Sequence, residues 1–250
     1  MRRESSGDRR VLAIGASRGT GLLIARLLTE AGVAVRALAR DPARATEALG
    51  PAAEVVAGDI RHLESLPPAM ENISHIVFTA GQRSNRPARE ESVRDTEYQG
   101  VVNTLRAARA AGFGGRFLYM TAIGAGRRSI AAAFLNLFKG NTLRWRERAE
   151  GEIRSAGFDY TIIRSGVLVD APAGEHLIKL SQTPLPLSLR YRIARGDVAA
   201  GFVAALDHPR ASRATFEIVW GDRGRPEPWS QLLDRLQQDS GRQPSAAFTE

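Results

Sequence analysis

The sequence predicts an α/β fold in which helices cover both faces of a doubly wound parallel sheet. Three observations favour this class. At residues 10–21 a short apolar run enters a glycine-rich turn, which opens directly into a helical repeat. Apolar runs and amphipathic helices then alternate as far as residue 164, a rhythm typical of βαβ units. Beyond that point Pro172, Pro184 and Pro186 interrupt the pattern, so we expect a small C-terminal lobe.

Composition and the first residues limit the class of protein. The 250 residues are 43% hydrophobic and 25% charged, as in ordinary globular proteins. Residues 1–9 are polar with no apolar segment behind them, so we expect a disordered tail there and a single domain over 10–250. No apolar run approaches the roughly 20 residues of a membrane span, and the chain has no cysteine. We expect a cytoplasmic protein.

The net charge of +8 invites a nucleic-acid interpretation. The arginines are scattered along the chain, however, and aromatic residues make up only 6%, so neither a basic stripe nor a stacking platform for bases is visible. We therefore expect a small-molecule substrate and no nucleic-acid partner. The sequence leaves the oligomeric state open between monomer and homodimer.

The glycine-rich turn predicts a dinucleotide site. An apolar strand at 11–14 is followed by Gly15, Gly19 and Gly21, and a helix is predicted over 20–31. Glycine supplies the positive φ that such a turn needs, and its missing side chain lets a pyrophosphate reach backbone N–H groups at the helix N-terminus. The spacing G-x-x-x-G-x-G is looser than the strict fingerprint, so a glycine turn without a ligand is the alternative. The residues assigned to the site are Gly15, Ala16, Ser17, Arg18, Gly19, Thr20 and Gly21.

The end of the next strand favours NADP over NAD. A strand predicted over 33–39 is followed by Arg40 and Asp41. An acid at this position would hold a ribose 2′-hydroxyl, whereas an arginine accommodates the 2′-phosphate of NADP. Arg40 and the turn residue Arg18 both supply a guanidinium, while Asp41, with proline after it, is typical of a helix cap. We expect NADPH as the cofactor, with NAD less favoured.

Two further strand ends extend the site. A helix at 42–49 and a strand at 54–57 lead to Gly58-Asp59-Ile60, a loop that borders the adenine in such sites; an Asx turn is the alternative. The strand over 73–79 ends in Ala80-Gly81, whose small size lets the backbone approach the cofactor. The residues assigned here are Asp59, Ile60, Ala80 and Gly81.

The second half of the chain continues the alternation and then loses it. The expected elements are a helix over 89–111, strands over 116–121 and 159–164, helices over 142–156, 196–206 and 229–239, and a strand over 215–220. The segment 124–141 differs from this pattern, because two arginines precede an apolar stretch at 131–138. A lid over the nicotinamide, a patch for a partner and a core helix are the alternatives for this stretch. We expect the substrate lobe to be built mainly from 124–141 and 166–250.

Other site chemistries find no support in the sequence. The four histidines share no ligand spacing, so we expect no metal site. No G-x-S-x-G motif is present to supply the nucleophile of a hydrolase.

Several separate motifs carry a family resemblance. They lie at residues 15–21, 39–42, 58–59, 95–103, 148–168 and 193–199. Over about 10–220 the chain resembles the atypical short-chain dehydrogenase/reductases, in particular the NAD(P)-binding group of NmrA-like proteins, B-type flavin/biliverdin reductases and Tic62-like plant proteins. The resemblance implies a Rossmann-type fold and a bound NADP(H), and it leaves the substrate open because the group differs widely in function.

The resemblance also implies roles near the nicotinamide. Thr121 lies where the catalytic serine region of typical members begins, and it either bonds a substrate oxygen or caps its strand. Arg146 stands at the position of their catalytic lysine. Ser165, which replaces a common proline, begins the segment Ser165, Gly166 and Val167 that we assign to the cofactor site.

The chain lacks the Tyr-x-x-x-Lys pair of typical short-chain dehydrogenases. The residues four positions after the four tyrosines are Val102, Ile123, Arg164 and Arg195. An arginine at the lysine position can hold ribose hydroxyls, but it is a poor proton shuttle because its pKa stays above about 12. Two hypotheses follow. One is an NADP(H)-dependent oxidoreductase that passes hydride to a flavin, a quinone or a similar acceptor; the alternative is a non-catalytic NADP(H)-binding redox sensor or scaffold of the NmrA-like type.

Overall fold

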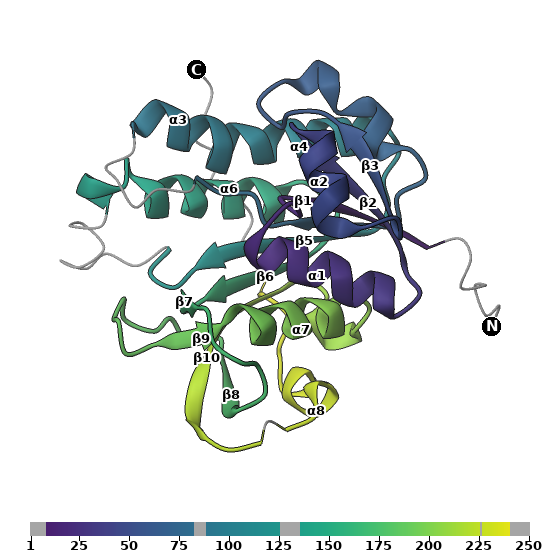
Figure 1. Ribbon diagram of the computed structural model, residues 1–250. Coiled ribbons are helices and arrows are strands. Elements are labelled where there is room, and N and C mark those ends of the chain that lie inside the picture. Colours follow the sequence, from purple (N-terminus) through teal and green to yellow (C-terminus); the bar gives the residue numbers. More distant parts are fainter. Residues whose placement is uncertain (1–8, 83–88, 126–135, 226, 241–250) are drawn as a thin grey trace.

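The computed structural model describes residues 9–82, 89–125, 136–225 and 227–240 (Figure 1). Its centre is an eight-stranded sheet in the order β3-β2-β1-β4-β5-β6-β10-β8, parallel except for the antiparallel pair β10–β8. The strands are β1 (Arg10–Ile14), β2 (Ala34–Ala39), β3 (Ala53–Ala57), β4 (His75–Phe78), β5 (Arg116–Ala122), β6 (Asp159–Ser165), β8 (His176–Ser181) and β10 (Ala214–Arg223). The predicted doubly wound fold is confirmed.

Helices cover both faces of the sheet (Figure 1). On one face lie α1 (Gly19–Glu30), α2 (Pro42–Leu49), α7 (Arg195–Ala205) and α8 (Trp229–Asp234), and on the other lie α3 (Glu90–Arg94), α4 (Gly100–Ala110) and α6 (Thr142–Ser155). Successive residues of a strand point to opposite faces, so each strand serves both layers. In β6, for example, Ile163 packs with the α1 and α7 layer and Ile162 with the α4 and α6 layer.

The topology places a crevice at the carboxyl ends of the strands. The chain runs outward through β1, β2 and β3 and then returns to β4 on the other side of β1. Ligands of doubly wound sheets bind where the strand order reverses in this way. The turn after β1 and the loops after β2, β3, β4, β5 and β6 therefore meet along one edge.

The helix expected over 89–111 is interrupted. Between α3 and α4 a π-helical turn, η3 (Asp95–Gln99), shifts the register by one residue. A π-turn has no composition signal that separates it from an α-helix, so the sequence could not show it. It matters because Glu97 lies within it.

The prediction was least accurate after residue 165. Two short strands, β7 (Val167–Val169) and β9 (Arg192–Ala194), form a separate parallel pair, and β8 extends the main sheet. Strands of three residues are too short for a periodicity to be recognised. The helix expected over 229–239 ends at Asp234.

The apolar stretch predicted at 131–138 cannot be assigned to a lid, a patch or a core helix, because most of it lies outside the described residues. Within the described part of the chain, no helix is long and apolar enough to cross a membrane.

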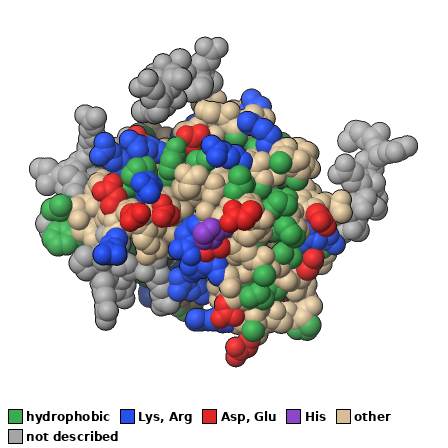
Figure 2. All heavy atoms as spheres, turned by 90° about the horizontal axis from the view of Figure 1, so that it is seen from above, with side chains coloured by type: hydrophobic (Ala, Val, Ile, Leu, Met, Phe, Trp, Pro, Cys, Tyr) green, Lys and Arg blue, Asp and Glu red, His purple; other side chains and the backbone are tan. Residues whose placement is uncertain are grey.

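When the molecule is viewed from above, its Lys and Arg side chains form several groups, most with acidic side chains beside them (Figure 2).

Candidate functional site

The turn after β1 is closed tightly against the end of β4. Gly15 has φ 89°, and a methyl group on it would lie only 2.7 Å from the backbone nitrogen of Ala80. Gly21 packs in the same way on the Thr79 hydroxyl and the carbonyl of Gly15. Any larger residue at Gly15 or Gly21 would push α1 away from the sheet, so these glycines fix where the helix begins.

The N-terminus of α1 lacks a cap from the described residues. Arg18, at the N-cap, is extended and its side chain makes no capping hydrogen bond, and the first turn contains no acid. The Thr20 hydroxyl is buried and has no hydrogen-bond partner among the described residues. Free backbone N–H groups and the positive end of the helix dipole make this an anion site. The residues present fit the pyrophosphate of a dinucleotide.

Arg40 and Asp41, which follow β2, make different contacts. The Asp41 carboxylate accepts a hydrogen bond from the backbone nitrogen of Arg44 at 3.1 Å, so the predicted helix cap is confirmed. Arg40 is exposed, and its charge acts on Asp59 at the end of β3. The structure thus brings Arg40 and Asp59 together, with Asp41 engaged in its own helix.

Asp59 is held by an arginine that the sequence analysis did not single out. Arg61 donates from Nη2 to Asp59 Oδ2 at 2.5 Å and from Nε at 3.0 Å. Burial raises the pKa of Asp59, but the hydrogen bonds and charge of Arg61, with the charge of Arg40, outweigh it and hold the pKa below its usual value. Asp59 also accepts the Arg61 backbone N–H at 3.0 Å, an Asx turn.

Ile60 turns away from the crevice. Its side chain lies in the core, in contact with Gly100, where a methyl group would be 2.6 Å from Ile60 Cδ1. Its carbonyl accepts a hydrogen bond from the Asn103 amide at 2.9 Å. Ile60 therefore anchors the loop after β3 to α4, which leaves Asp59 as the polar residue at this strand end.

Gly81 lies against a buried ion pair. A methyl group on Gly81 would come within 2.9 Å of Arg146 Nη2, so the guanidinium is packed on the backbone that ends β4. Arg146 donates to Glu97 twice, from Nε at 3.1 Å and from Nη2 at 2.9 Å. Glu97 also accepts the Thr142 hydroxyl and the backbone N–H of Gln82. Gly81 and Arg146, both predicted to belong to the cofactor site, therefore lie together. Glu97, which holds Arg146 there, was not identified from the sequence.

The Glu97–Arg146 pair is fixed in its ionised form. Glu97 is only 2% exposed and Arg146 18%. Burial raises the pKa of Glu97, but the charge and hydrogen bonds of Arg146, with those from Thr142 and Gln82, outweigh it and lower the pKa. Burial lowers the pKa of Arg146, but the charge of Glu97 outweighs it and raises the pKa. The guanidinium can donate hydrogen bonds at this edge and does not release a proton.

The hydroxyls at the ends of β5 and β6 lie inside the protein. Thr121 is fully buried, and its hydroxyl has no hydrogen-bond partner among the described residues. Ser165 is 4% exposed and donates to the Thr121 carbonyl at 3.2 Å. Gly166 and Val167 continue beside Tyr191, whose carbonyl accepts the Val167 N–H at 2.7 Å. These residues join β5, β6 and β7 at the carboxyl ends of the strands.

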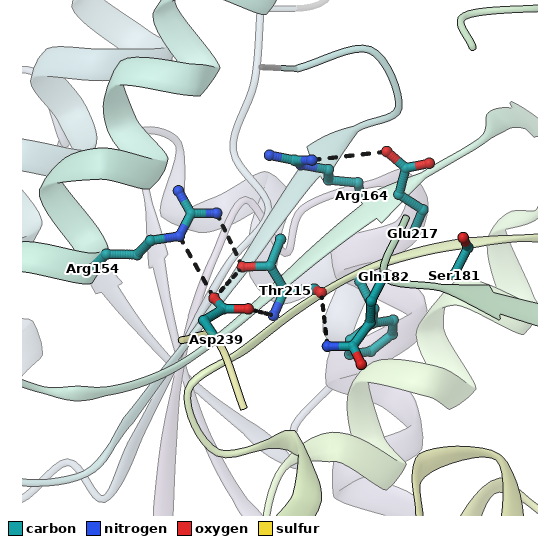
Figure 3. Close-up of a pocket in the computed structure, with 8 residues that line it drawn as sticks. Arg154, Arg164, Ser181, Gln182, Thr215, Glu217 and Asp239 are labelled. Carbon is teal, nitrogen blue, oxygen red and sulfur yellow. Dashed lines mark hydrogen bonds and ion pairs between the residues drawn. The ribbon is translucent and has the colours of Figure 1, made fainter. Parts of the chain in front are cut away.

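A separate polar pocket of about 220 Å³ is lined by residues of α6, β6, β8 and β10 (Figure 3). Its charged side chains are paired: Arg154 Nε lies 3.6 Å from Asp239 Oδ2, and Arg164 Nη1 lies 3.8 Å from Glu217 Oε1. The pocket is lined by Arg154, Arg164, Ser181, Gln182, Thr215, Phe216, Glu217 and Asp239. With its charges so engaged, the pocket supports the packing of the C-terminal segment on the sheet.

The histidines lie apart from the crevice. His75 and His208 are paired with Asp207 at 3.2 Å and Asp234 at 3.4 Å, His62 lies 3.5 Å from Glu64, and His176 stacks on Trp220. No group of three metal-ligating side chains is found among the described residues.

The fold and the strand ends around the glycine turn define a dinucleotide-binding protein of the doubly wound class. A family model described as NAD(P)H-binding matches residues 15–209. The chain belongs to this family. This match and the relatives fit the resemblance to the atypical short-chain dehydrogenase/reductases that the sequence motifs indicate.

Named relatives include a reductase. Sanguinarine reductase from Eschscholzia californica is 29% identical over 254 residues, covering 86% of this chain and 90% of that protein. Among solved structures, an oxidoreductase from Lactococcus lactis has a TM-score of 0.73 at 16% identity, covering 91% of this chain and 96% of the other. An anaerobillin reductase from Escherichia coli has a TM-score of 0.68 at 22% identity, covering 85% and 98%. At these identities the structures show a shared fold.

Proposed function

We propose that this protein is an NADP(H)-dependent oxidoreductase that transfers hydride to a small organic acceptor, such as a flavin, a quinone or a similar carbonyl-like compound. The observation that carries the proposal is the guanidinium of Arg146, held by buried Glu97 against Gly81 at the nicotinamide end of the crevice. When bound, the nicotinamide supplies the hydride. We propose that Arg146 binds ribose hydroxyls and orients the ring.

The proton is proposed to come from solvent. Arg146 keeps its proton, and the hydroxyls of Thr121 and Ser165 are buried. Tyr119 is 1% exposed, and burial raises its pKa far above the usual value, so it is no acid for a substrate either. Acceptors that can take hydride without a positioned acid therefore suit this site best.

NADP is proposed over NAD because cations gather where the 2′-phosphate would lie. Arg40 follows β2, and Arg61 lies beside Asp59 at the end of β3. The acid that could have favoured NAD, Asp41, caps its own helix. A guanidinium fork is well suited to phosphate oxygens.

The reductase proposal also draws on sanguinarine reductase, a relative whose match covers 86% of this chain. Its name denotes reduction of a small organic molecule, and we propose the same kind of acceptor here. The assignment of 124–141 and 166–250 to a substrate lobe, the cytoplasmic location and the choice between monomer and homodimer stay predictions.

The test is a titration of purified protein with NADPH and NADH, followed by acceptors watched at the NADPH absorbance. Tight NADPH binding with turnover of FMN, riboflavin or a small quinone supports the proposal. Arg146→Ala should lower kcat by about tenfold or more if Arg146 orients the bound nicotinamide. The surface variant Arg148→Ala, on the same helix, should leave the rate unchanged.

A redox sensor is the second candidate. It is favoured because the hydroxyls of Thr121 and Ser165 are buried. Neither hydroxyl is therefore accessible as a proton donor for a substrate. Tight NADPH binding without turnover over a broad acceptor panel would select it. A sensor should also change its oligomeric state or partner affinity between NADP⁺ and NADPH, which analytical ultracentrifugation would measure.

A further inference from the structure

Arg195, the first residue of α7, lies beside the glycine-rich turn although 176 positions separate it from Gly19. A methyl group on Gly19 would lie 3.9 Å from Arg195 Nε, and no other described atom comes within 4 Å of that point apart from the turn's own chain. Helices α1 and α7 pack side by side, which brings their first residues together (Figure 1). The guanidinium therefore stands over the N-terminus of α1.

This position is electrostatically unfavourable for a cation. A helix N-terminus carries about half a positive charge, and Arg195 lies at two of them, its own and that of α1. The first turn of α1 contains no acid to compensate. Asp197, in the first turn of α7, is buried and accepts hydrogen bonds from Gly174 N and Trp220 Nε1 at 2.8 and 2.7 Å.

The acid that does pair with Arg195 is a weak partner. Asp170 Oδ1 accepts from Arg195 Nη1 at 2.7 Å, but the Asp170 side chain is 90% exposed. An ion pair at the surface is strongly screened by water. Arg195 itself is 29% exposed, so its remaining N–H donors can reach a ligand in the crevice.

The buried Thr20 hydroxyl is a second observation at the same place. Thr20 follows Gly19 and is 4% exposed, and its hydroxyl has no partner among the described residues. The Arg195 guanidinium, the uncapped N-terminus of α1 and the unpartnered Thr20 hydroxyl thus all lie at or next to Gly19. A pyrophosphate, with its several charged acceptor oxygens, suits donors of this kind.

We propose that Arg195 binds the pyrophosphate of the dinucleotide from the side opposite the glycine-rich turn. The proposal rests on the proposed cofactor site and adds a phosphate-binding residue from the second half of the chain. Asp170 positions the guanidinium until the ligand arrives. Arg195 then recognises the part that NADPH and NADH share, whereas Arg40 recognises the 2′-phosphate that distinguishes them.

The test is calorimetric titration of the full chain with NADPH, NADH, ADP-ribose and 2′-AMP. Arg195→Gln should raise the Kd of NADPH, NADH and ADP-ribose alike by about tenfold, the effect of losing one charge-assisted hydrogen bond. Its Kd for 2′-AMP, which has no pyrophosphate, should stay within about twofold of wild type. Arg210→Gln, the same charge change beyond the other end of α7, is the matched control and should alter none of the four.

The outcomes separate this proposal from the cofactor assignment. If wild type binds neither dinucleotide, the proposed function fails and this proposal with it. If wild type binds both and Arg195→Gln binds them equally well, only the role of Arg195 is overturned. A loss confined to NADPH would assign Arg195 to the 2′-phosphate, and an equal loss for 2′-AMP would indicate a purely structural role; both overturn the proposal. Arg195→Lys, which keeps the charge, should bind the dinucleotides more tightly than Arg195→Gln.

Discussion

Buried Glu97 accepts hydrogen bonds from two separate parts of the chain. Arg146 and Thr142 reach it from α6, and the Gln82 N–H reaches it from the loop after β4. A carboxylate so completely paired costs little to bury, whereas a lone charge left behind is costly. At the residue scale, this pair holds the loop after β4 and helix α6 in one geometry.

Glu97→Gln should lower the free energy of unfolding by about 3 kcal/mol, because it leaves the Arg146 charge without its buried partner. Urea denaturation measures this. Glu152→Gln is the control, since exposed Glu152 accepts a hydrogen bond from the Tyr98 hydroxyl at 2.9 Å, and it should change stability by less than about 1 kcal/mol. Equal stability of wild type and Glu97→Gln would contradict the role of the pair.

The same variant should change the acid limb of stability. The pKa of Glu97 is lowered in the folded protein from an ordinary value of 4.5. Its stabilisation is therefore complete above about pH 4.5 and is lost as the pH falls through the lowered pKa. Wild type should lose this contribution on acidification, and Glu97→Gln should show a flatter pH dependence below pH 4.5.

Cofactor preference is also decided by single residues. Arg40→Ala should raise the Kd of NADPH by about tenfold or more and leave that of NADH nearly unchanged, because only NADPH has the 2′-phosphate. Fluorescence titration with each dinucleotide measures the ratio. The exposed Arg106→Ala on α4 removes the same charge on the opposite layer and should leave both constants unchanged.

At the element scale, local signals determine where helices begin. The Asp41 carboxylate and Pro42 start α2, and Gly15 and Gly21 place α1 against the end of β4. The cap and the conformation of the glycine turn depend on a few neighbouring residues, so their sequence signals were correct, although the contact of the turn with β4 is tertiary. The π-turn η3, which contains Glu97, was not predictable, because its composition does not differ from that of an α-helix.

Asp41→Ala should cost about 1 kcal/mol of stability through the lost cap. Asp41→Asn, which keeps a capping oxygen, should recover most of it in the same thermal or urea denaturation. The ratio of NADPH to NADH affinity should be the same in all three proteins. A selective loss of NADH binding in Asp41→Ala would show instead that this carboxylate holds a ribose hydroxyl.

At the scale of the whole molecule, the C-terminal segment is fastened to the sheet by Asp239. Its carboxylate accepts a hydrogen bond from the Tyr160 hydroxyl at 3.0 Å. It also accepts one from the Thr215 hydroxyl at 2.6 Å (Figure 3). Burial, together with the charge and hydrogen bond of Asp239, raises the pKa of Tyr160 to about 12. One acid late in the chain therefore connects β6 and β10.

This contact should appear in the alkaline limb of stability. The tyrosine is neutral in the folded protein up to about pH 12, whereas an unfolded tyrosine ionises near 10. The stabilisation is complete below pH 10 and is lost as the pH rises from about 10 to 12. Tyr160→Phe should flatten that limb, and Tyr191→Phe should not. Identical pH profiles for wild type and Tyr160→Phe would contradict this role.

The sequence by itself determined the class of fold, the glycine turn and the cap at Asp41, because buried strands, tight turns and helix caps depend on neighbours in the chain. The tertiary structure alone decided which side chains share the crevice. Glu97 joins Arg146, and Arg195 joins Gly19, across 49 and 176 positions. Such pairs form only after the sheet has brought distant strand ends to one edge, so no spacing in the sequence could reveal them.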